Sequence, residues 1–252
     1  MTETILNERR DGINIIRMNR PEKKNALTQD MYSIMVKALE EGEADDTVRV
    51  HVLLGTPGAF SAGNDIADFM KVAAGGEGGL SRPVHQVLHS LAGLKKPLIT
   101  GVDGIAVGIG TTFNLHADLT FATPRTNFHT PFVDLALVPE AGSSLLVPNL
   151  VGHQKAFALL AAGIPMSAVD AERAGLIWKV VAEDALETEV FAAAEALAKK
   201  PPEALRLSRD LLKKTARTDV ISRIEEEIQL FGERLKSSEA LAAFQAFMTR
   251  KK

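Results

Sequence analysis

Five short apolar runs, rich in β-branched residues, punctuate the first 190 residues of the chain and are separated by stretches with helical spacing. Runs of this length and composition are typical of buried strands. They are INIIRM (13–18), VRVHVLLG (48–55), PLITGVDGIAVGIG (97–110), ADLTFA (117–122) and GLIWKVV (175–181). Strands that alternate with helices predict an α/β fold in which the strands pair largely in parallel.

Two helices are predicted between these strands. Thr28 can cap the first, in which apolar residues recur at helical spacing from Met31 to Leu39. A second helix is expected through VHQVLHSLAGL (84–94). The glycines of AAGGEGGL (73–80), just before that helix, are typical of a flexible surface loop.

The chain changes character near residue 191, after which it is helix-forming, charged and free of strand signals. The prolines of KKPP (199–202) predict the end of one helix and the start of another. We therefore predict an α/β body over residues 1–190 and a helical oligomerisation region over residues 191–252. An apolar stripe in this region has to be buried against the body or another subunit: Ile221, Ile224, Ile228, Leu230, Phe231, Leu235, Leu241, Phe244 and Phe247.

Composition narrows the class of protein. The 252 residues are 46% hydrophobic and 24% charged, and 29 basic against 32 acidic side chains give a net charge of −3. An acidic balance argues against a nucleic-acid partner, and the absence of cysteine excludes disulfides, cysteine zinc sites and thiol nucleophiles. We find no run long enough to span a membrane, no secretory signal and no histidine spacing typical of a metal site. A cytoplasmic protein with no membrane partner and no metal is expected.

Two acids interrupt the apolar segment TPFVDLALVPEAGSS (130–144). A carboxylate among apolar neighbours costs free energy unless it is paired, solvated or used in chemistry. Asp134 and Glu140 are both candidates from the pattern alone, with a partly solvated ion pair as the ordinary alternative for Asp134.

Two glycine-containing loops each follow a predicted strand: FSAGNDI (60–66) and DGIAVGIGTTF (103–113). Gly63 allows a sharp turn that leaves the Asn64 N–H pointing outward, and a helix beginning near Ile109 has unpaired amides in its first turn. Two such amides that converge would form an oxyanion hole, whose individual donors are worth about 3–4 kcal/mol of barrier. Simple turn punctuation explains the same glycines.

These loops carry a family resemblance when they are taken in order. GAFSAGNDI, KKPLITGVDGIAVGIG, ADLTFATPRTNFHTPF and SAVDAERAGLIWKVV resemble the enoyl-CoA hydratase/isomerase (crotonase) superfamily over nearly the whole chain. The resemblance implies a ββα superhelical body, a C-terminal helical trimerisation region, and a homotrimer or dimer of trimers. It implies an acyl-CoA substrate, coenzyme A being part of that substrate and not a separate cofactor. The amides of Asn64 and Ile109 would hold the thioester oxygen.

Departures from the hydratase pattern sharpen the expectation. Hydratases of this superfamily use two glutamates, at positions that are Thr112 and Phe132 here. The combination of AVGIG, FHTPF and PEAGSS resembles the peroxisomal-type Δ3,Δ2-enoyl-CoA isomerases, in which the acid before the small-residue turn is the base. That acid is Glu140. One carboxylate can move a proton from C2 to C4 while the amides stabilise the enolate.

The resemblance also implies substrate contacts. The loop around AGND would bind coenzyme A mainly through main chain, the basic loop NRPEKKNAL would meet phosphate groups, and an apolar wall would face the acyl chain. The implied binding residues are Lys24, Ala26, Ala62, Gly63, Asp65, Ile66, Gly108, Phe132 and Leu137. Arg250 and Lys251 in the basic tail are weaker candidates for a phosphate contact.

Other activities stay open. The chain could be a nominal enoyl-CoA hydratase, a dienoyl-CoA isomerase, or an acyl-CoA-binding protein that lacks catalysis. Glu140 distinguishes an enzyme from a binding protein, because only the enzyme needs the carboxylate of this residue. His129 is expected to be a packing residue, Ser143 and Ser144 to cap the following helix, and the lone Trp178 to lie in the core.

Overall fold

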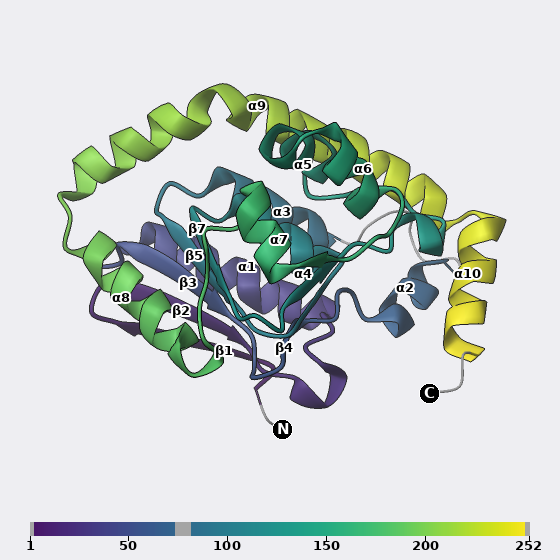
Figure 1. The fold of residues 1–252 in the computed structure, drawn as a ribbon, viewed down its shortest axis with the longest axis horizontal. Helices are drawn as coiled ribbons and strands as arrows, with labels where there is room; N and C mark the ends of the chain where they lie inside the picture. Colours follow the sequence, from purple (N-terminus) through teal and green to yellow (C-terminus); the bar gives the residue numbers. More distant parts are fainter. Residues whose placement is uncertain (1–2, 74–81, 250–252) are drawn as a thin grey trace.

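The computed structural model describes residues 3–73 and 82–249, which form two β-sheets wrapped by helices (Figure 1). The larger sheet has the strand order β1-β2-β3-β5-β7-β10, and the smaller has the order β4-β6-β8-β9. Most of the segment predicted to be a flexible loop (73–80), together with Arg250 and Lys251, lies outside the described residues.

The strands are β1 Ile5–Arg10, β2 Ile13–Met18, β3 Val50–Leu54, β4 Ala59–Ser61, β5 Leu98–Val102, β6 Ile105–Val107, β7 Leu119–Ala122, β8 Asn127–His129, β9 Met166–Ser167 and β10 Lys179–Val180. The α-helices are α1 Gln29–Ala44, α2 Ile66–Ala73, α3 Arg82–Gly93, α4 Ile109–Thr112, α5 Ser143–Val151, α6 His153–Leu160, α7 Ala168–Ala174, α8 Leu186–Ala198, α9 Pro202–Leu235 and α10 Ser238–Thr249. Short 3₁₀ helices are η1 Pro21–Lys23, η2 Phe113–His116, η3 Val133–Leu135 and η4 Glu183–Ala185.

The larger sheet buries apolar side chains on both faces, as the nearly continuous apolar runs require. Along β2, Ile13 and Ile15 point into a second core beneath α8, whereas Ile16 and Met18 point into the main core with α1 and α3. This alternation follows from the two-residue period of a strand. Apart from the β1–β2 hairpin the pairings of this sheet are parallel, so the predicted α/β class is confirmed. The predicted strand pattern did not include β1, because its exposed face is polar.

The smaller sheet arises where the apolar run 97–110 divides into β5 and β6, which belong to different sheets. The sequence predicts here a buried strand that runs into a glycine-spaced turn; β5 is that strand, and the short strand β6 within the expected turn was not predicted. Between them Gly104 has φ +72, and a Cβ there would lie 2.0 Å from the Gly58 carbonyl oxygen. Only glycine permits both the left-handed backbone and this close approach. The chain thus turns sharply from the larger sheet into the smaller one.

The first helix begins as predicted, because the Thr28 side chain accepts a hydrogen bond from Met31 N at 3.3 Å. The helical C-terminal part also has its break at the predicted prolines, since α8 ends at Ala198 and α9 begins at Pro202. The expected domain boundary at residue 190 falls inside α8. This helix packs on the larger sheet, with Val190 in the second core.

Helix α9 arches over the top of the molecule in Figure 1, and α10 turns back beside α2. Part of the predicted apolar stripe is buried within this one chain, namely Ile224, Ile228, Phe231, Leu235 and Phe244. Leu230 and Phe247 are about half exposed.

Trp178 is 61% exposed, so its expected place in the core was wrong. It lies between α7 and the short strand β10, directly after the buried Leu176 and Ile177.

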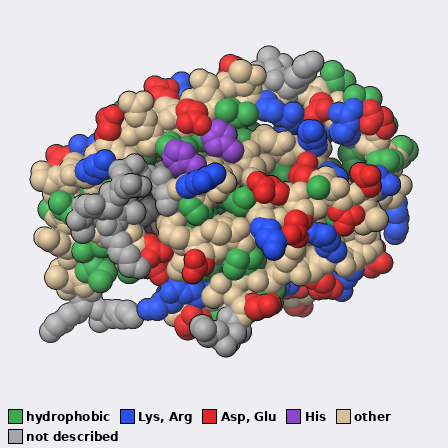
Figure 2. All heavy atoms as spheres, turned by 180° about the vertical axis from the view of Figure 1, so that it is seen from behind, with side chains coloured by type: hydrophobic (Ala, Val, Ile, Leu, Met, Phe, Trp, Pro, Cys, Tyr) green, Lys and Arg blue, Asp and Glu red, His purple; other side chains and the backbone are tan. Residues whose placement is uncertain are grey.

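The outer surface mixes charges of both signs. Seen from behind, acidic and basic side chains are interspersed over much of the face, with apolar side chains between them (Figure 2). Within the described ranges, no helix has the length and apolar character that crossing a bilayer requires.

Replacing Gly104 by alanine is expected to destabilise the fold more than the same change at Gly58. Both glycines have positive φ, so both variants carry the left-handed strain of about 1–2 kcal/mol, but a Cβ at Gly58 would meet nothing within 4 Å. Overpacking at Gly104 adds about 1–3 kcal/mol. Urea unfolding of G104A and G58A measures the difference, and equal losses would contradict the proposed contact.

Candidate active site

Three neighbouring parallel strands end at the same edge of the smaller sheet. Strand β4 pairs in parallel with β6, and β6 pairs in parallel with β8. Because parallel strands place their carboxyl ends together, the loops that follow them are neighbours. The first loop contains Asn64, the second leads to Ile109, and the third runs through Phe132 to Glu140. The topology thus gathers the three residues predicted to act on the thioester.

The first two loops are in direct contact through glycines. A Cβ on Gly63, whose φ is +90, would lie 2.9 Å from the Val107 carbonyl oxygen. A Cβ on Gly110 would lie 2.7 Å from the Ser61 carbonyl oxygen. These positions need glycine because two main chains pass too close for a side chain. The glycines therefore do more than punctuate turns: they set the spacing between the loops.

In the loop 61–65, the Asn64 N–H stands apart from its neighbours. Within the described residues it makes no hydrogen bond, whereas the adjacent amides are bonded inside the protein. Ala62 N donates to Lys24 O (2.8 Å), Gly63 N to Ser61 Oγ (3.1 Å) and Asp65 N to Leu27 O (2.9 Å). Contacts of Ala62, Gly63 or Asp65 with a ligand would therefore have to use groups other than these amides.

The Ile109 amide is the second donor without a partner in the described part of the chain. Gly108, with φ +54, precedes helix α4, and its own N–H donates to His129 O at 2.8 Å. Ile109 is the first residue of α4, where the helix supplies no acceptor for an N–H. Its side chain is buried in the main core. The local fold thus fixes the amide and leaves it available.

Glu140 lies in the loop after β8, with its side chain buried. Thr112 Oγ1 donates to Glu140 Oε1 at 2.5 Å, while Oε2 has no hydrogen-bond partner among the described residues. Burial raises the pKa of Glu140 to about 8; the Thr112 hydrogen bond opposes this rise and the charge of Glu227 adds to it. A carboxyl group with such a pKa can take up and return a proton near neutral pH.

The backbone that follows Glu140 is constrained. Ala141 and Gly142 both have positive φ, at 63° and 72°. His116 Nε2 donates to the Ala141 carbonyl at 2.9 Å. Burial, and then the charge of Lys213, lower the pKa of His116 to about 4, so the ring is a neutral donor at pH 7. The turn that orients the Glu140 carboxyl is therefore held by a side chain from another segment of the chain.

Helix α5 begins in the same turn without help from its serines. Gly142 occupies the N-cap position, and neither Ser143 nor Ser144 caps with its side chain, so that expectation was wrong. The carboxylate of Glu227 on α9 takes this role instead. It accepts hydrogen bonds from Gly142 N at 2.6 Å and Ser144 N at 2.9 Å.

Tyr32 connects two of the three loops. Its hydroxyl donates to the side-chain oxygen of Asn64 at 2.6 Å. Burial, followed by the charge of Glu140, raises the pKa of Tyr32 well above its ordinary value. The same buried phenol is thus bonded to Asn64 and affected by the charge of Glu140.

The basic loop 20–27 wraps the loop 61–65. Arg20 NH1 donates to the Asp65 carboxylate at 2.7 Å and to Ala26 O at 2.9 Å. Although burial alone would raise it, the bond from Arg20 lowers the pKa of Asp65. Lys24 is exposed and has φ 50 beside the half-buried Ala26. Asp65 therefore serves to hold the loops together, whatever else it contacts.

Phe132 and Leu137 are buried in the main core, joined by a bond from Leu137 N to Phe132 O at 2.8 Å. Ile66 is half-buried at the start of α2. Asp134, the rival acid, is exposed on η3. His129 bonds Gly163 O through Nε2 at 3.1 Å, in a packing role. Of the two acids, only Glu140 is enclosed.

Several residues of the site were not singled out as contributors from the sequence. Thr112 was noted only as a missing acid, yet it is the hydrogen-bond donor to Glu140. Tyr32 and His116 lie in apolar surroundings that give no signal of their own. Glu227 had a signal: it falls between Ile224 and Ile228 on the apolar face of a helix, where an acid is out of place.

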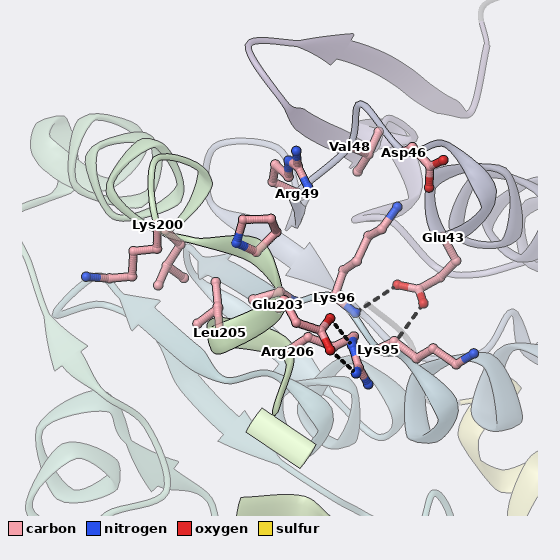
Figure 3. Close-up of a pocket in the computed structure, with 13 residues that line it drawn as sticks. Glu43, Asp46, Val48, Arg49, Lys95, Lys96, Lys200, Glu203, Leu205 and Arg206 are labelled. Atoms are coloured by element: carbon pink, nitrogen blue, oxygen red, sulfur yellow. Dashed lines mark hydrogen bonds and ion pairs between the residues drawn. The ribbon is translucent and has the colours of Figure 1, made fainter. Parts of the chain in front are cut away.

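A cavity of about 330 Å³ lies elsewhere, between the end of α1 and the α8–α9 junction (Figure 3). Half of the eight described charged side chains that line it have hydrogen-bond partners. Arg206 bonds Glu203, Lys96 Nζ bonds the carbonyls of Gly42 and Asp45, and Glu43 accepts from two main-chain amides. We interpret this cavity as a packing gap between the body and the C-terminal helices. Across residues 3–73 and 82–249, no three His, Asp or Glu side chains are placed to hold a metal ion.

Comparison with known proteins shows the family of the chain. The family model for enoyl-CoA hydratase/isomerase matches residues 8–252. The chain belongs to this family. The resemblance to the crotonase superfamily, nearest its isomerases, and the predicted crotonase-type fold are thereby confirmed.

Relatives within the family carry different names. The chain is 36% identical over 243 residues to enoyl-CoA delta isomerase 2 of Rattus norvegicus, covering 95% of this chain and 62% of that protein. It is 31% identical to 1,2-epoxyphenylacetyl-CoA isomerase of Escherichia coli (strain K12), covering 98% and 97% of the two chains. The structure of Pseudomonas aeruginosa OdaA matches with a TM-score of 0.94 and 39% identity, covering 99% of this chain and 100% of that one.

The buried acid predicts an unusual pH dependence of stability. Because the pKa of Glu140 is raised from 4.5 to about 8 on folding, the folded chain holds a proton that the unfolded chain has released. The free energy of unfolding should therefore fall as pH rises from about 4.5 to about 8, by up to about 1.4 kcal/mol per pH unit. E140Q should gain stability relative to the wild type over this range in urea unfolding at pH 5 to 9. A difference that stays constant with pH would contradict the raised pKa.

Proposed function

We propose that the chain is an enoyl-CoA isomerase that shifts a double bond from C3–C4 to C2–C3 of an acyl-CoA. The observation that carries this proposal is the buried carboxyl of Glu140. One of its oxygens has no partner among the described residues, and it lies in the loop beside two main-chain amides that also lack partners there. The similarity to an enoyl-CoA delta isomerase supports the same reaction class.

In the proposed mechanism the amides of Asn64 and Ile109 hold the thioester oxygen. The Glu140 carboxylate removes a proton from C2, and the electron pair moves into the carbonyl to give a dienolate whose charge the two amides stabilise. The protonated Glu140 then returns the proton at C4, and the double bond forms between C2 and C3. No water or second acid is consumed. Oε2, which has no partner within the described chain, is the oxygen suited to both transfers.

The surroundings of Glu140 favour isomerisation over hydration. Adding water needs one group to activate the water and another to protonate carbon. At the positions where hydratases of the superfamily have their glutamates, this chain has Thr112 and Phe132. The Thr112 hydroxyl donates its hydrogen bond to Glu140, and Phe132 is buried and apolar. One base remains, which suffices for a proton shuttle.

We place the substrate's coenzyme A along the loops 20–27 and 61–66. Lys23 and Lys24 are exposed there and can meet phosphate groups, while Ala26, Ala62, Gly63, Asp65, Ile66 and Gly108 lie on or beside these loops. Phe132 and Leu137 would limit the acyl pocket. We further propose the homotrimer or dimer of trimers and the cytoplasmic location expected from the sequence.

Replacing Glu140 by glutamine should abolish most of the isomerisation. Loss of general acid–base catalysis is worth roughly 10²–10⁴-fold, so kcat for conversion of 3-enoyl-CoA to 2-enoyl-CoA should fall by that factor. Binding of a saturated acyl-CoA should change little, because glutamine keeps the size and polarity of the side chain. The absorbance of the thioester conjugated with the new C2–C3 double bond follows the reaction and gives kcat. Calorimetry measures acyl-CoA binding.

D134N is the matched control, since Asp134 is an exposed acid six residues earlier in the same segment. Its kcat should equal that of the wild type. Rapid hydration of 2-enoyl-CoA by the wild type would instead indicate a hydratase. Acyl-CoA binding without turnover, unchanged in E140Q, would indicate a binding protein.

A further inference from the structure

The C-terminal helix α9 reaches into the candidate active site through one buried acid. Glu227 is 4% exposed and lies between Ile224 and Ile228 on the buried face of α9. Its two carboxylate oxygens accept from separate amides, Oε2 from Gly142 N at 2.6 Å and Oε1 from Ser144 N at 2.9 Å. Both amides belong to the turn that follows Glu140, 83 to 85 residues away in the sequence.

That turn is costly to maintain. Ala141 has φ 63 although it carries a Cβ, a left-handed conformation that is unfavourable for any residue but glycine, and Gly142 follows with φ 72. The first amides of α5 also need acceptors, because a helix cannot satisfy them itself. Glu227 supplies two such acceptors, and its negative charge suits the positive end of the α5 dipole. A shift of this turn would displace the carboxyl of Glu140 directly.

We propose that Glu227 is a positioning residue for isomerisation: it clamps the turn at Ala141–Gly142 so that the Glu140 carboxyl stays aimed at the substrate. This inference rests on the proposed function. It gives the C-terminal helical region a part in catalysis, because the aim of the base depends on a side chain from α9. Glu227 itself would touch neither the substrate nor the moving proton.

Several charged or titratable groups face the two acids. Glu140 faces Tyr32 from α1 and Glu227 from α9, and Thr112 of α4 donates to it. Burial raises the pKa of Glu227; the hydrogen bonds from Ser144 and Gly142 oppose this rise, and the charge of Arg223 on the same helix opposes it less. His116, which holds Ala141, is neutral at pH 7. Because the charge of Glu227 raises the pKa of Glu140, its removal should lower that pKa.

E227Q tests the proposal, because glutamine keeps the size of the side chain but loses the charge and one acceptor. We expect kcat for isomerisation to fall about 10- to 100-fold, while KM and acyl-CoA binding stay within about twofold. The acidic limb of the pH–rate profile should also move to lower pH. A cap with a merely structural role would lower thermal stability and leave kcat and this limb unchanged, which would overturn the proposal.

The control is E225Q, on the same helix two residues earlier, where Glu225 is exposed and bonds His89. It should match the wild type in kcat and in the pH limb. If E227Q does not fold, E227D replaces it. The shorter side chain keeps the charge, so kcat should fall while the acidic limb of the pH–rate profile stays where it is in the wild type. An unchanged kcat would overturn the proposal. A wild type without isomerase activity would refute the proposed function itself, a result distinct from any of these.

Discussion

The parallel pairing of β4, β6 and β8 is the constraint on which the candidate site depends. Each strand is only three residues long, so none of them is stable alone, and their register rests on hydrogen bonds and on glycines where main chains meet. Once the pairing forms, the three following loops must share one edge. The Asn64 amide, the Ile109 amide and Glu140 then come together although they are spread over 77 residues, from 64 to 140 inclusive.

Burying the carboxyl of Glu140 is unfavourable for the fold and useful for chemistry. An uncompensated buried acid loses its hydration, and the single hydrogen bond from Thr112 restores only part of it. The result is a carboxyl whose pKa is raised to about 8, which suits the proton transfer that we propose for it. Stability given up at one position in return for function is the general pattern at active sites.

Helix α9 joins two regions that the chain keeps far apart in sequence. Its later turns enter the main core and bring Glu227 to the turn after Glu140, while its earlier turns expose Leu211 and Leu212 at 79% and 85%. Exposed leucines on the predicted oligomerisation region are where another subunit could bind, which stays a prediction. A helix that carries both features would link assembly to the geometry of the base.

The pattern of residues was sufficient for the α/β class, the capped helix at Thr28 and the break at KKPP. These features depend on local spacing and on turn residues, which act over a few positions. A resemblance to a family was needed to prefer Glu140 over Asp134, because both acids sit in similar apolar sequence. The burial of one and the exposure of the other depend on which face of the loop meets the core.

Folding in three dimensions settled what local spacing could not. The division of one apolar run into β5 and β6, the exposure of Trp178, and the bonds from Thr112, His116 and Glu227 all arise from contacts between distant segments. Such contacts leave little trace in a single sequence, since a threonine or glutamate looks the same whether it is solvated or buried against a turn. Periodicity records which side chains avoid water, but the partner of a buried polar group is chosen by the packing of the whole chain.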